Sequence, residues 1–190
     1  KRIVFPNSGR GLPRKKYFRS EREAEGQSAT NWWHHDQFGS NQAANSAMEA
    51  LLGEKNVFNN PKPLELLAGI LSVGNVREDD VVVDFFAGSG ATGHAVMARN
   101  AADGGQRRYI LAQLPEPLDP GNEDQKVAAT FCDKLGRPRN IAELTKERLR
   151  RAAAKVKADN PMFAGDSGFR VFKLDATNIQ EWEPNRDDLA

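Results

Sequence analysis

The sequence predicts an α/β fold built on a parallel sheet, and three features support this class. The run Val81–Phe86 is apolar except for Asp84 and does not alternate, which is typical of a strand buried on both faces. The glycine turn Gly88–Gly90 follows it, and a helix-forming stretch follows the turn. A second apolar run, Tyr109–Leu114, lies about 25 residues further on. This separation fits a crossover through a helix, so the two strands should be parallel and their connection right-handed.

Composition limits the possible classes of protein. The 190 residues suit one domain, and with 39% hydrophobic residues and a formal net charge of +1 they can form a sizeable core. No apolar run approaches the roughly 18 residues that a membrane span needs, and Lys1 starts no recognisable targeting segment. The single cysteine, Cys132, excludes an internal disulfide and a cysteine metal cluster. We therefore expect a cytoplasmic protein with no membrane partner.

Residues 1–55 are predicted to be an extended basic arm followed by a tryptophan-rich connecting segment. Pro6, Gly9, Gly11 and Pro13 favour loop structure in the arm. The basic residues of the arm are Lys1, Arg2, Arg10, Arg14, Lys15, Lys16, Arg19 and Arg22. They could neutralise the phosphates of a nucleic acid, but a solvated arm is the favoured interpretation.

The connecting segment places two tryptophans beside the potential metal ligands His34, His35 and Asp36. Adjacent histidines point apart on a strand and diverge on a helix, so a metal site would need further ligands that the sequence does not show. We expect no metal here. Trp32 and Trp33 could stack on a base, because aromatic faces accept any base, but core packing is the favoured role.

Residues 56–165 are predicted to form the α/β core, preceded by a short helix over 46–52 that stops at Gly53. A better-marked helix follows Pro63, with apolar residues at i, i+3, i+4 and i+7 from Leu64 to Leu71. Lys62 then stands at a helix N-terminus, which suits the binding of a ligand carboxylate. The alternative is a solvated lysine on a capped surface helix.

A ligand is expected at the glycine turn, because the turn lets backbone amides approach a ligand and the next helix directs its positive end to the same point. Gly88-x-Gly90-x-x-Gly93 formally matches the dinucleotide fingerprint, which alone is weak support. Asp84 favours a different ligand from a dinucleotide, since a carboxylate inside a strand is costly to bury unless it has a partner. S-adenosylmethionine, which carries a sulfonium and an amino group, would supply one.

The acid that holds a ribose in dinucleotide-binding folds stands about 20 residues further on, at the end of the next strand. The second strand ends instead on Gln113, which is neutral but can hydrogen-bond a ribose hydroxyl. Glu116 could bind the ribose in its place, or could be a solvent-facing loop acid. The absence of an acid at Gln113 weakens the assignment of S-adenosylmethionine as the cofactor, and it weakens the assignment of a dinucleotide more.

The rest of the chain is predicted to be mainly helical. Helices are expected over 91–101, over 124–134 and, from a capping-box-like start at Asn140 and Glu143, to about residue 158. His94 on the first of them should be structural or solvated. The last helix has a basic face of a kind that is usually solvated, although phosphate contact is conceivable. Its basic residues are Arg148, Arg150, Arg151, Lys155 and Lys157. Residues 166–190 are predicted to form a strand over 169–174 and a frayed acidic tail.

Four stretches together resemble one family. The sequence DFFAGSGAT at 84–92 resembles the S-adenosylmethionine motif of DNA methyltransferases that methylate adenine N6 or cytosine N4. NPKPLEL at 60–66 resembles the lysine-proline motif that precedes the glycine loop in the circularly arranged members. DGGQRRYILAQLPE at 103–116 is most similar to the modification subunit of type III restriction-modification systems, and GFRVFKLD at 168–175 resembles a later segment of the same subunits.

The resemblance implies a Rossmann-like S-adenosylmethionine-dependent methyltransferase fold, with a mostly parallel sheet and helices on both faces, incomplete in this chain. It implies methylation of an exocyclic base amine, adenine N6 in the type III systems. The implied partners are double-stranded DNA, a restriction subunit and a second modification subunit. It also places Asn41 and Gln42 near the cofactor or target pocket. The residues expected to bind the cofactor are Lys62, Pro63, Asp84, Phe86, Gly88, Ser89, Gly90, Gln113 and Glu116.

One motif of this family is missing. The catalytic tetrapeptide contains a Pro-Pro pair, and the chain contains none. We therefore expect a fragment that holds the cofactor half of the enzyme, binds S-adenosylmethionine weakly or not at all, and does not methylate DNA by itself. Two alternatives remain open at this point. They are a nicotinamide-dinucleotide-binding oxidoreductase domain and a non-enzymatic DNA-binding or assembly module that uses the basic arm and the basic helix face.

Overall fold

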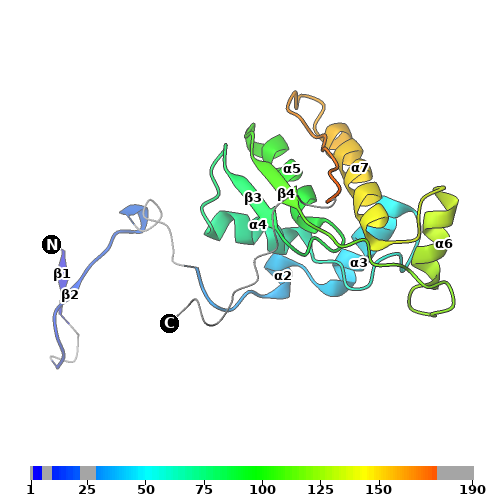
Figure 1. Cartoon of the computed structure of the whole chain (residues 1–190). Coiled ribbons are helices and arrows are strands. Elements are labelled where there is room, and N and C mark those ends of the chain that lie inside the picture. Colours follow the sequence, from blue (N-terminus) through cyan, green and yellow to red (C-terminus); the bar gives the residue numbers. More distant parts are fainter. Residues whose placement is uncertain (1, 6–9, 22–28, 175–190) are drawn as a thin grey trace, which may run out of the picture.

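The computed structural model describes residues 2–5, 10–21 and 29–174 (Figure 1). In the arm, β1 (Ile3–Val4) and β2 (Arg14–Lys15) pair antiparallel, with Ile3 opposite Lys15. The sequence predicted loop structure there, and the two short strands are a small correction. All four residues of the pair are exposed, so this pairing adds nothing to a core.

A parallel pair of strands forms the sheet of the core. β3 (Val81–Asp84) lies beside β4 (Arg108–Leu111), with Val81 opposite Arg108 and Asp84 opposite Leu111. The connection between them contains α5 (Ala91–Asp103). The predicted crossover and the parallel pairing are confirmed, although both strands are shorter than predicted.

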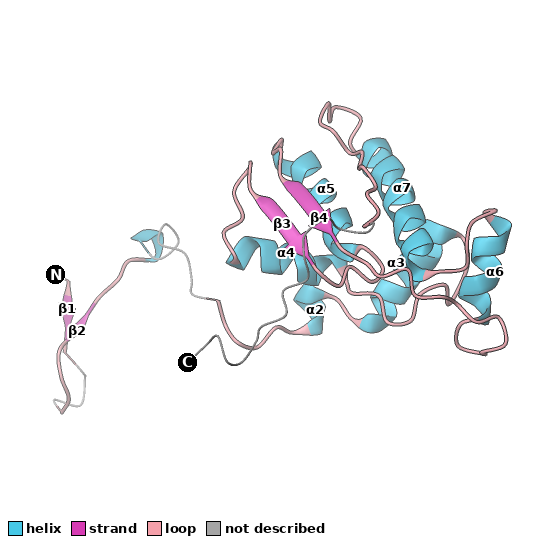
Figure 2. Ribbon diagram, in the orientation of Figure 1, coloured by secondary structure: helices cyan, strands magenta, loops and turns pink. Residues whose placement is uncertain are grey.

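The sheet is covered on one face only in the described part of the chain (Figure 2). Val82 and Tyr109 pack against α4 (Leu64–Val73) and α5, in a cluster centred on Leu71, Ala95 and Val96. The alternate side chains point to the opposite face, where Val81, Val83 and Ile110 are 42%, 46% and 58% exposed. The predictions of a strand buried on both faces and of helices on both faces are therefore wrong for these residues, because nothing described here covers the second face.

A second layer of helices extends the core beyond the sheet. It consists of α3 (Asn41–Leu52), α6 (Lys126–Lys134) and α7 (Ile141–Asp159). Met48 and Leu52 of α3 are buried with residues of α6 and α7. The helix begins earlier than predicted, because the Ser40 hydroxyl accepts a hydrogen bond from the Ala43 amide and caps its start. Packing places α3 with the core, although the sequence division at residue 55 assigned it to the connecting segment.

The tryptophan segment docks on α4 through a glycine. Trp33 stacks on Phe38, the last residue of α2 (His35–Phe38), with ring centroids 4.4 Å apart. A Cβ on Gly69 would lie 2.6 Å from a Phe38 ring carbon and 3.2 Å from Trp33, so only glycine leaves room for this contact. The favoured packing role holds for Trp33, whereas Trp32 is 75% exposed.

The basic face predicted for α7 is largely paired or buried. The helix begins as predicted, since the Asn140 side chain accepts from the Glu143 amide. Arg151 and Arg150 form ion pairs with Glu147, and Arg148 is only 3% exposed. This helix therefore offers fewer solvated cations than its sequence suggests.

The predicted strand over 169–174 is absent. Residues 169–174 have no regular structure, and among the described residues no strand pairs with them. Phe169 packs partly into the core, but Phe172 and Leu174 are fully or almost fully exposed. The predicted acidic tail lies outside the described residues, which end at residue 174. None of the described helices has the length and hydropathy required to cross a bilayer.

Candidate functional site

A cavity of about 430 Å³ opens where the glycine loop, the segment before α4 and the start of α7 meet. The loop supplies polar backbone, and the helical layer supplies an apolar wall. Its lining residues are Val57, Phe58, Asn59, Asn60, Pro61, Lys62, Leu67, Asp84, Phe86, Ala87, Gly88, Ser89, Ala91, Thr92, Leu118, Asp124, Gln125, Ala128, Ile141 and Leu144. Segments far apart in the sequence thus form one site.

Five of the residues proposed from the sequence line this cavity: Lys62, Asp84, Phe86, Gly88 and Ser89. They come from two stretches, the start of α4 and the loop after β3. The structure therefore brings together the lysine-proline stretch and the glycine turn, which the sequence connected only through a resemblance.

Two further residues from that set support the cavity without lining it. Pro63 is buried and occupies the N-cap position of α4. Gly90 is buried at the N-cap of α5 with φ of 75°, a left-handed conformation that favours glycine. A Cβ at Gly90 would lie 3.1 Å from Cγ2 of Thr145. Gly90 is therefore required both by its backbone conformation and by the close approach of α7.

Asp84 is half-buried, and both of its carboxylate oxygens have partners within the chain. Oδ1 accepts from the Phe86 amide at 3.1 Å, and Oδ2 accepts from the Thr92 hydroxyl at 2.6 Å. The premise that this acid requires a cationic ligand to be tolerated is therefore wrong. Each carboxylate oxygen can accept a second hydrogen bond, so Asp84 can hold the loop and face a ligand in the cavity as well.

Gln113 holds the glycine loop from the next strand. Its Oε1 accepts from the Gly88 amide at 2.7 Å, and its Nε2 donates to the Leu114 carbonyl at 3.2 Å. Neither Gln113 nor Glu116 lines the cavity, and Glu116 is exposed. The structure thus places Gln113 in a supporting position rather than in one that contacts a ribose.

The cavity has polar groups of both signs. The N-termini of α4 and α5 lie at it, and neither has a side-chain cap, so their free amides and positive dipole ends favour an anionic group. Lys62 adds a cation at the same side. Asp84 and Asp124 add two acids. This arrangement suits a ligand that carries both a carboxylate and a cationic group.

The sequence did not identify the apolar wall or the second acid. Phe58, Leu118, Ile141 and Leu144 form much of the wall, and nothing in their spacing distinguishes them from other core residues. Asp124 lies in the long loop after β4. Its only signal was that loops at the carboxyl ends of parallel strands commonly build sites.

A buried histidine lies behind the cavity on α5. His94 is 6% exposed, and burial, reinforced by the neighbouring Arg148 and Lys155, lowers its pKa to about 4. Its Nδ1 has no hydrogen-bond partner among the residues that the structure describes. His94 is therefore neutral at pH 7 and structural, in agreement with one of the two roles expected for it.

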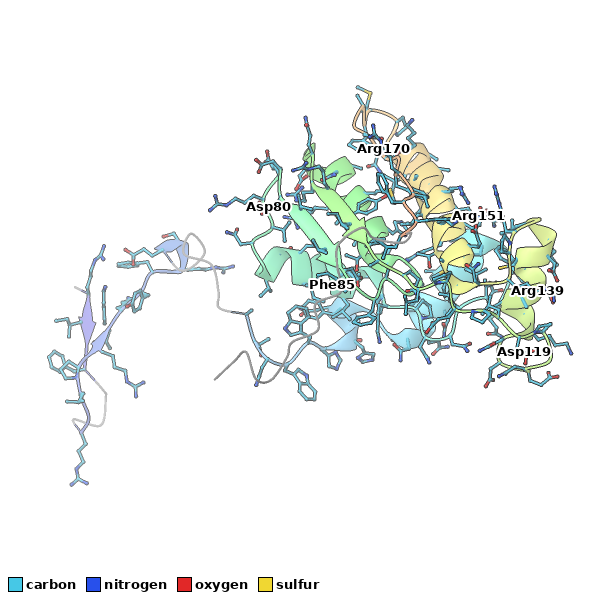
Figure 3. The ribbon with its side chains drawn as sticks, viewed as in Figure 1. Asp80, Phe85, Asp119, Arg139, Arg151 and Arg170 are labelled. Atoms are coloured by element: carbon cyan, nitrogen blue, oxygen red, sulfur yellow. The ribbon has the colours of Figure 1, made fainter. Side chains whose placement is uncertain are left out.

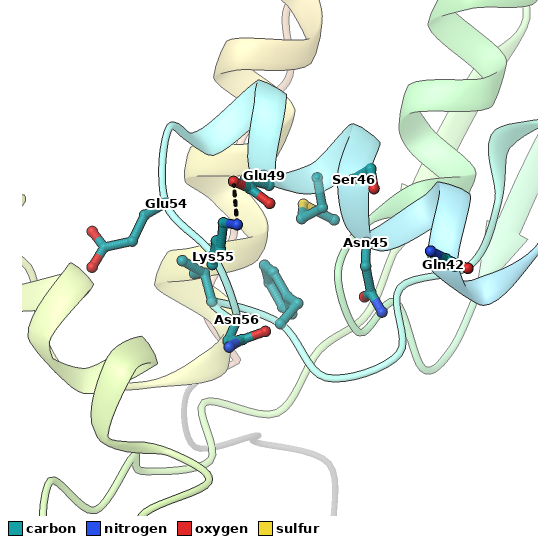
Figure 4. A pocket seen from close by; sticks show the side chains of 10 residues that line it. Gln42, Asn45, Ser46, Glu49, Glu54, Lys55 and Asn56 are labelled. Atoms are coloured by element: carbon teal, nitrogen blue, oxygen red, sulfur yellow. Dashed lines mark ion pairs between the residues drawn. The ribbon is translucent and has the colours of Figure 1, made fainter.

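A smaller cavity, of about 300 Å³, shares Val57 and Phe58 with the first (Figure 4). Gln42 and Asn45 of α3 line it, and an ion pair joins Lys55 and Glu49 at 3.4 Å. Gln42 thus lies near the main cavity but not in it, while Asn41 lines neither.

Three exposed polar side chains lie close together at the start of α2, those of His34, His35 and Asp36. Nitrogen and carboxylate atoms of His34, His35 and Asp36 lie within 4.8 Å of one another. His34 Nδ1 accepts from the Asp36 amide and caps α2. The geometry is thus explained by a short capped helix.

Comparisons with known proteins agree with these features. Residues 6–111 match the N6/N4 DNA methylase family. The chain is 37% identical over 179 residues to the Mod subunit of the type III restriction-modification enzyme StyLTI of Salmonella typhimurium, covering 94% of this chain and 25% of that subunit. It is 31% identical to the EcoPI Mod subunit of Escherichia phage P1, covering 83% of this chain and 23% of the subunit. It is 36% identical over 86 residues to the type II methyltransferase M.KpnI of Klebsiella pneumoniae, covering 45% of this chain and 20% of that enzyme. The chain spans about a quarter of the length of these type III relatives.

Proposed function

The chain belongs to the N6/N4 DNA methylase family and is close to type III modification subunits, and on this premise we propose that it forms the cofactor-binding part of a restriction-modification DNA methyltransferase. The whole enzyme would transfer a methyl group from S-adenosylmethionine to an exocyclic base amine, adenine N6 in particular. It would act on double-stranded DNA in the cytoplasm.

One observation carries this proposal. The family-matched stretches at 60–66 and 84–92, which residues 67–83 separate in the sequence, line a single cavity that also has an apolar wall. S-adenosylmethionine has three parts with different requirements: a zwitterionic amino acid, a ribose and a flat adenine. The cavity offers helix N-termini with a lysine, acids, and apolar side chains.

The residues in the cavity suggest how each part would be held. Lys62 and the first amides of α4 would bind the carboxylate. Asp84, supported by Thr92 and Phe86, would accept from the amino group. Phe58 and Leu144 would cover the adenine. When bound, the cofactor supplies an electrophilic methyl group on its sulfonium.

The acid that holds the ribose is proposed to be Asp124 rather than Gln113 or Glu116. Asp124 lines the cavity, whereas Glu116 does not and the Gln113 amide is occupied by the loop. A carboxylate can accept from both ribose hydroxyls. Gln113 and Gly90 would then act indirectly, by fixing the loop.

The acceptor base would be extruded from the duplex and held by residues outside this chain, since the chain has no Pro-Pro motif. Positioning of the donor alone cannot supply the in-line geometry that methyl transfer needs. The 190-residue chain alone should therefore not methylate DNA, and methyl transfer by the purified chain would contradict this division.

Titration calorimetry tests the cofactor assignment, using the methyltransferase that carries this chain. Asp84→Asn removes the charge at nearly constant volume and should weaken S-adenosylmethionine binding about tenfold, the loss of one charge-assisted hydrogen bond. Asp80→Asn is the matched control, because Asp80 also accepts a backbone hydrogen bond, from Arg77, but does not line the cavity. Tight binding of a nicotinamide dinucleotide with none of S-adenosylmethionine would reverse the assignment.

The complete Rossmann-like fold is part of the same proposal. The open sheet face carries Val81, Val83 and Ile110, and in the longer enzyme further strands and helices would cover it. The relatives are named as Mod subunits of type III enzymes, which supports a restriction subunit and a second modification subunit as partners. Light scattering of the longer protein, alone and with the restriction subunit, would measure both associations.

A further inference from the structure

Arg148 lies on the apolar side of α7, behind the glycine loop. It stands four residues after Leu144 and four before Ala152, so the three project from the same side of the helix. All three are buried, and Arg148 is 3% exposed. Burying a guanidinium is costly unless its protons are hydrogen-bonded. The acceptors it meets therefore indicate why the position tolerates it.

Both acceptors recorded for Arg148 belong to Ser89. Nη1 donates to the Ser89 carbonyl at 3.1 Å and to the Ser89 hydroxyl at 3.3 Å. The Nε atom is buried and has no partner in the described part of the chain. Burial lowers the pKa of Arg148 to about 10, so the side chain is still cationic at neutral pH.

Two more contacts hold the same loop. The Thr145 hydroxyl, one turn before Arg148 on α7, donates to the Gly88 carbonyl at 2.5 Å. Gln113 accepts from the Gly88 amide. Two successive carbonyls of the loop thus turn towards α7, while Gly88 and Ser89 also line the cavity.

From these contacts we propose that Arg148 is a positioning residue for cofactor binding: it fixes the Ser89 peptide from behind and so presets the cavity side of the glycine loop. Arg148 does not line the cavity, and in the described part of the chain the cavity residue to which it donates hydrogen bonds is Ser89. Its role would be to keep the loop in the binding conformation before the cofactor arrives, which lowers the cost of ordering on binding. The cofactor part of this inference rests on the proposed function.

The chain contains a matched control for this contact. Arg151, one turn further along α7, also donates a guanidinium proton to a backbone carbonyl, that of Leu52, and also pairs with Glu147. Its carbonyl belongs to the end of α3 and not to the loop. Arg148→Met and Arg151→Met each remove a side chain that spans two elements, but only the first releases Ser89.

Hydrogen exchange of the 190-residue chain tests the positioning without any ligand. In Arg148→Met, the hydrogen-bonded amides of Gly88 and Gly90 should exchange about tenfold faster, because one charged hydrogen bond no longer opposes local opening. In Arg151→Met they should exchange as in the wild type, and in Arg148→Lys, which can still donate to Ser89, within about threefold of it. Thermal melts of all variants identify any that fail to fold, and Arg148→Lys keeps the comparison usable if Arg148→Met is one of them.

Calorimetry then tests the cofactor part in the methyltransferase that carries this chain. Arg148→Met should weaken S-adenosylmethionine binding about tenfold, and Arg151→Met should not weaken it. Equal exchange of the Gly88 and Gly90 amides in the two methionine variants would overturn the positioning role. Faster exchange in Arg148→Met combined with no cofactor binding by the wild type would retain the positioning role and reject the proposed function instead.

Discussion

The two sides of the glycine loop are built differently. Behind the loop, α7 closes on it so tightly that Gly90 and Gly93 have almost no room for a Cβ, with Leu149 side-chain atoms 3.4 and 2.9 Å from the added carbons. In front, Phe85 and Phe86 are 73% and 87% exposed (Figure 3 labels Phe85). The side that faces α7 is a close-packed core, whereas the opposite side is a surface with large exposed apolar side chains.

This difference indicates which part of the site the chain completes by itself. Helix α7 and the segment after β4 fix the loop through Thr145, Arg148 and Gln113. In front, Phe85 and Phe86 are exposed, and no described residue covers them. Changes behind the loop should therefore alter the stability of this chain, and changes in front should alter only binding and assembly.

The largest effect is expected from Leu149→Ala behind the loop. Leu149 is 4% exposed and packs with Met97, Ala152 and Val156. Its removal leaves a cavity in a close-packed core, so the free energy of unfolding should fall by about 2–5 kcal/mol in urea titrations. Phe86→Ala in front should change it by no more than about 0.5 kcal/mol. Similar losses in the two variants would abolish the distinction between the sides.

The buried His94 should make the back side sensitive to acid. Its pKa is about 4 in the folded chain against 6.5 for the ordinary group, so the unfolded chain binds the proton first as the pH falls below 6.5. The stability contributed by neutral His94 is complete above pH 6.5 and is lost between pH 6.5 and 4, up to about 3 kcal/mol.

Urea titrations across that pH range provide the measurement. The free energy of unfolding should depend less steeply on pH in His94→Gln than in the wild type. In His35→Gln the dependence should persist, since the His35 side chain is 64% exposed. An unchanged slope in His94→Gln would assign the acid sensitivity to other groups.

Two glycines separate backbone strain from close packing. Gly90 and Gly104 both cap α5 in the left-handed conformation, with φ of 75° and 74°. A Cβ at Gly104 meets nothing within 4 Å, whereas one at Gly90 meets Thr145 at 3.1 Å. Gly104→Ala should cost about 1–2 kcal/mol of unfolding free energy from strain, and Gly90→Ala about 1 kcal/mol more from overpacking. Equal losses of unfolding free energy in the two variants, measured by thermal denaturation, would show that α7 moves aside to accommodate the added methyl group.

The smallest effect is expected on the open sheet face. Val83 is 46% exposed, so Val83→Lys should change the unfolding free energy of this chain by less than about 0.5 kcal/mol. In the longer methyltransferase the same lysine would be buried against the added layer, and expression of soluble, folded enzyme should drop. Equal tolerance in both would count against a covered face.

The sequence predicted the elements better than their surroundings. The crossover between β3 and β4 and the start of α7 at Asn140 followed from local signals: a continuous apolar run, a glycine turn and a capping box. Whether a strand is covered on both faces depends on what packs against it. The residues of a run such as Val81–Phe86 do not show which other segments pack there. Among residues 2–5, 10–21 and 29–174, side chains cover one face of the sheet only.

The candidate site was predicted in part for the same reason. Glycines and the lysine-proline stretch are local signals, and Lys62, Asp84, Gly88 and Ser89 line the cavity. Long-range partners were not predicted: Asp84 is satisfied by Thr92, and Gln113 by the loop. The charge of Arg148 predicts a solvated position, whereas its spacing from Leu144 places it on the buried side of α7.

The two-stranded sheet has a practical consequence for the isolated chain. In the described part, β3 and β4 each have a single neighbour, so each presents an unpaired outer edge of backbone donors and acceptors beside an apolar surface. Such edges recruit strands from other molecules. Dimers or aggregates of the isolated chain could then arise from pairing of these edges, so self-association of this chain is no measure of the subunit arrangement proposed above.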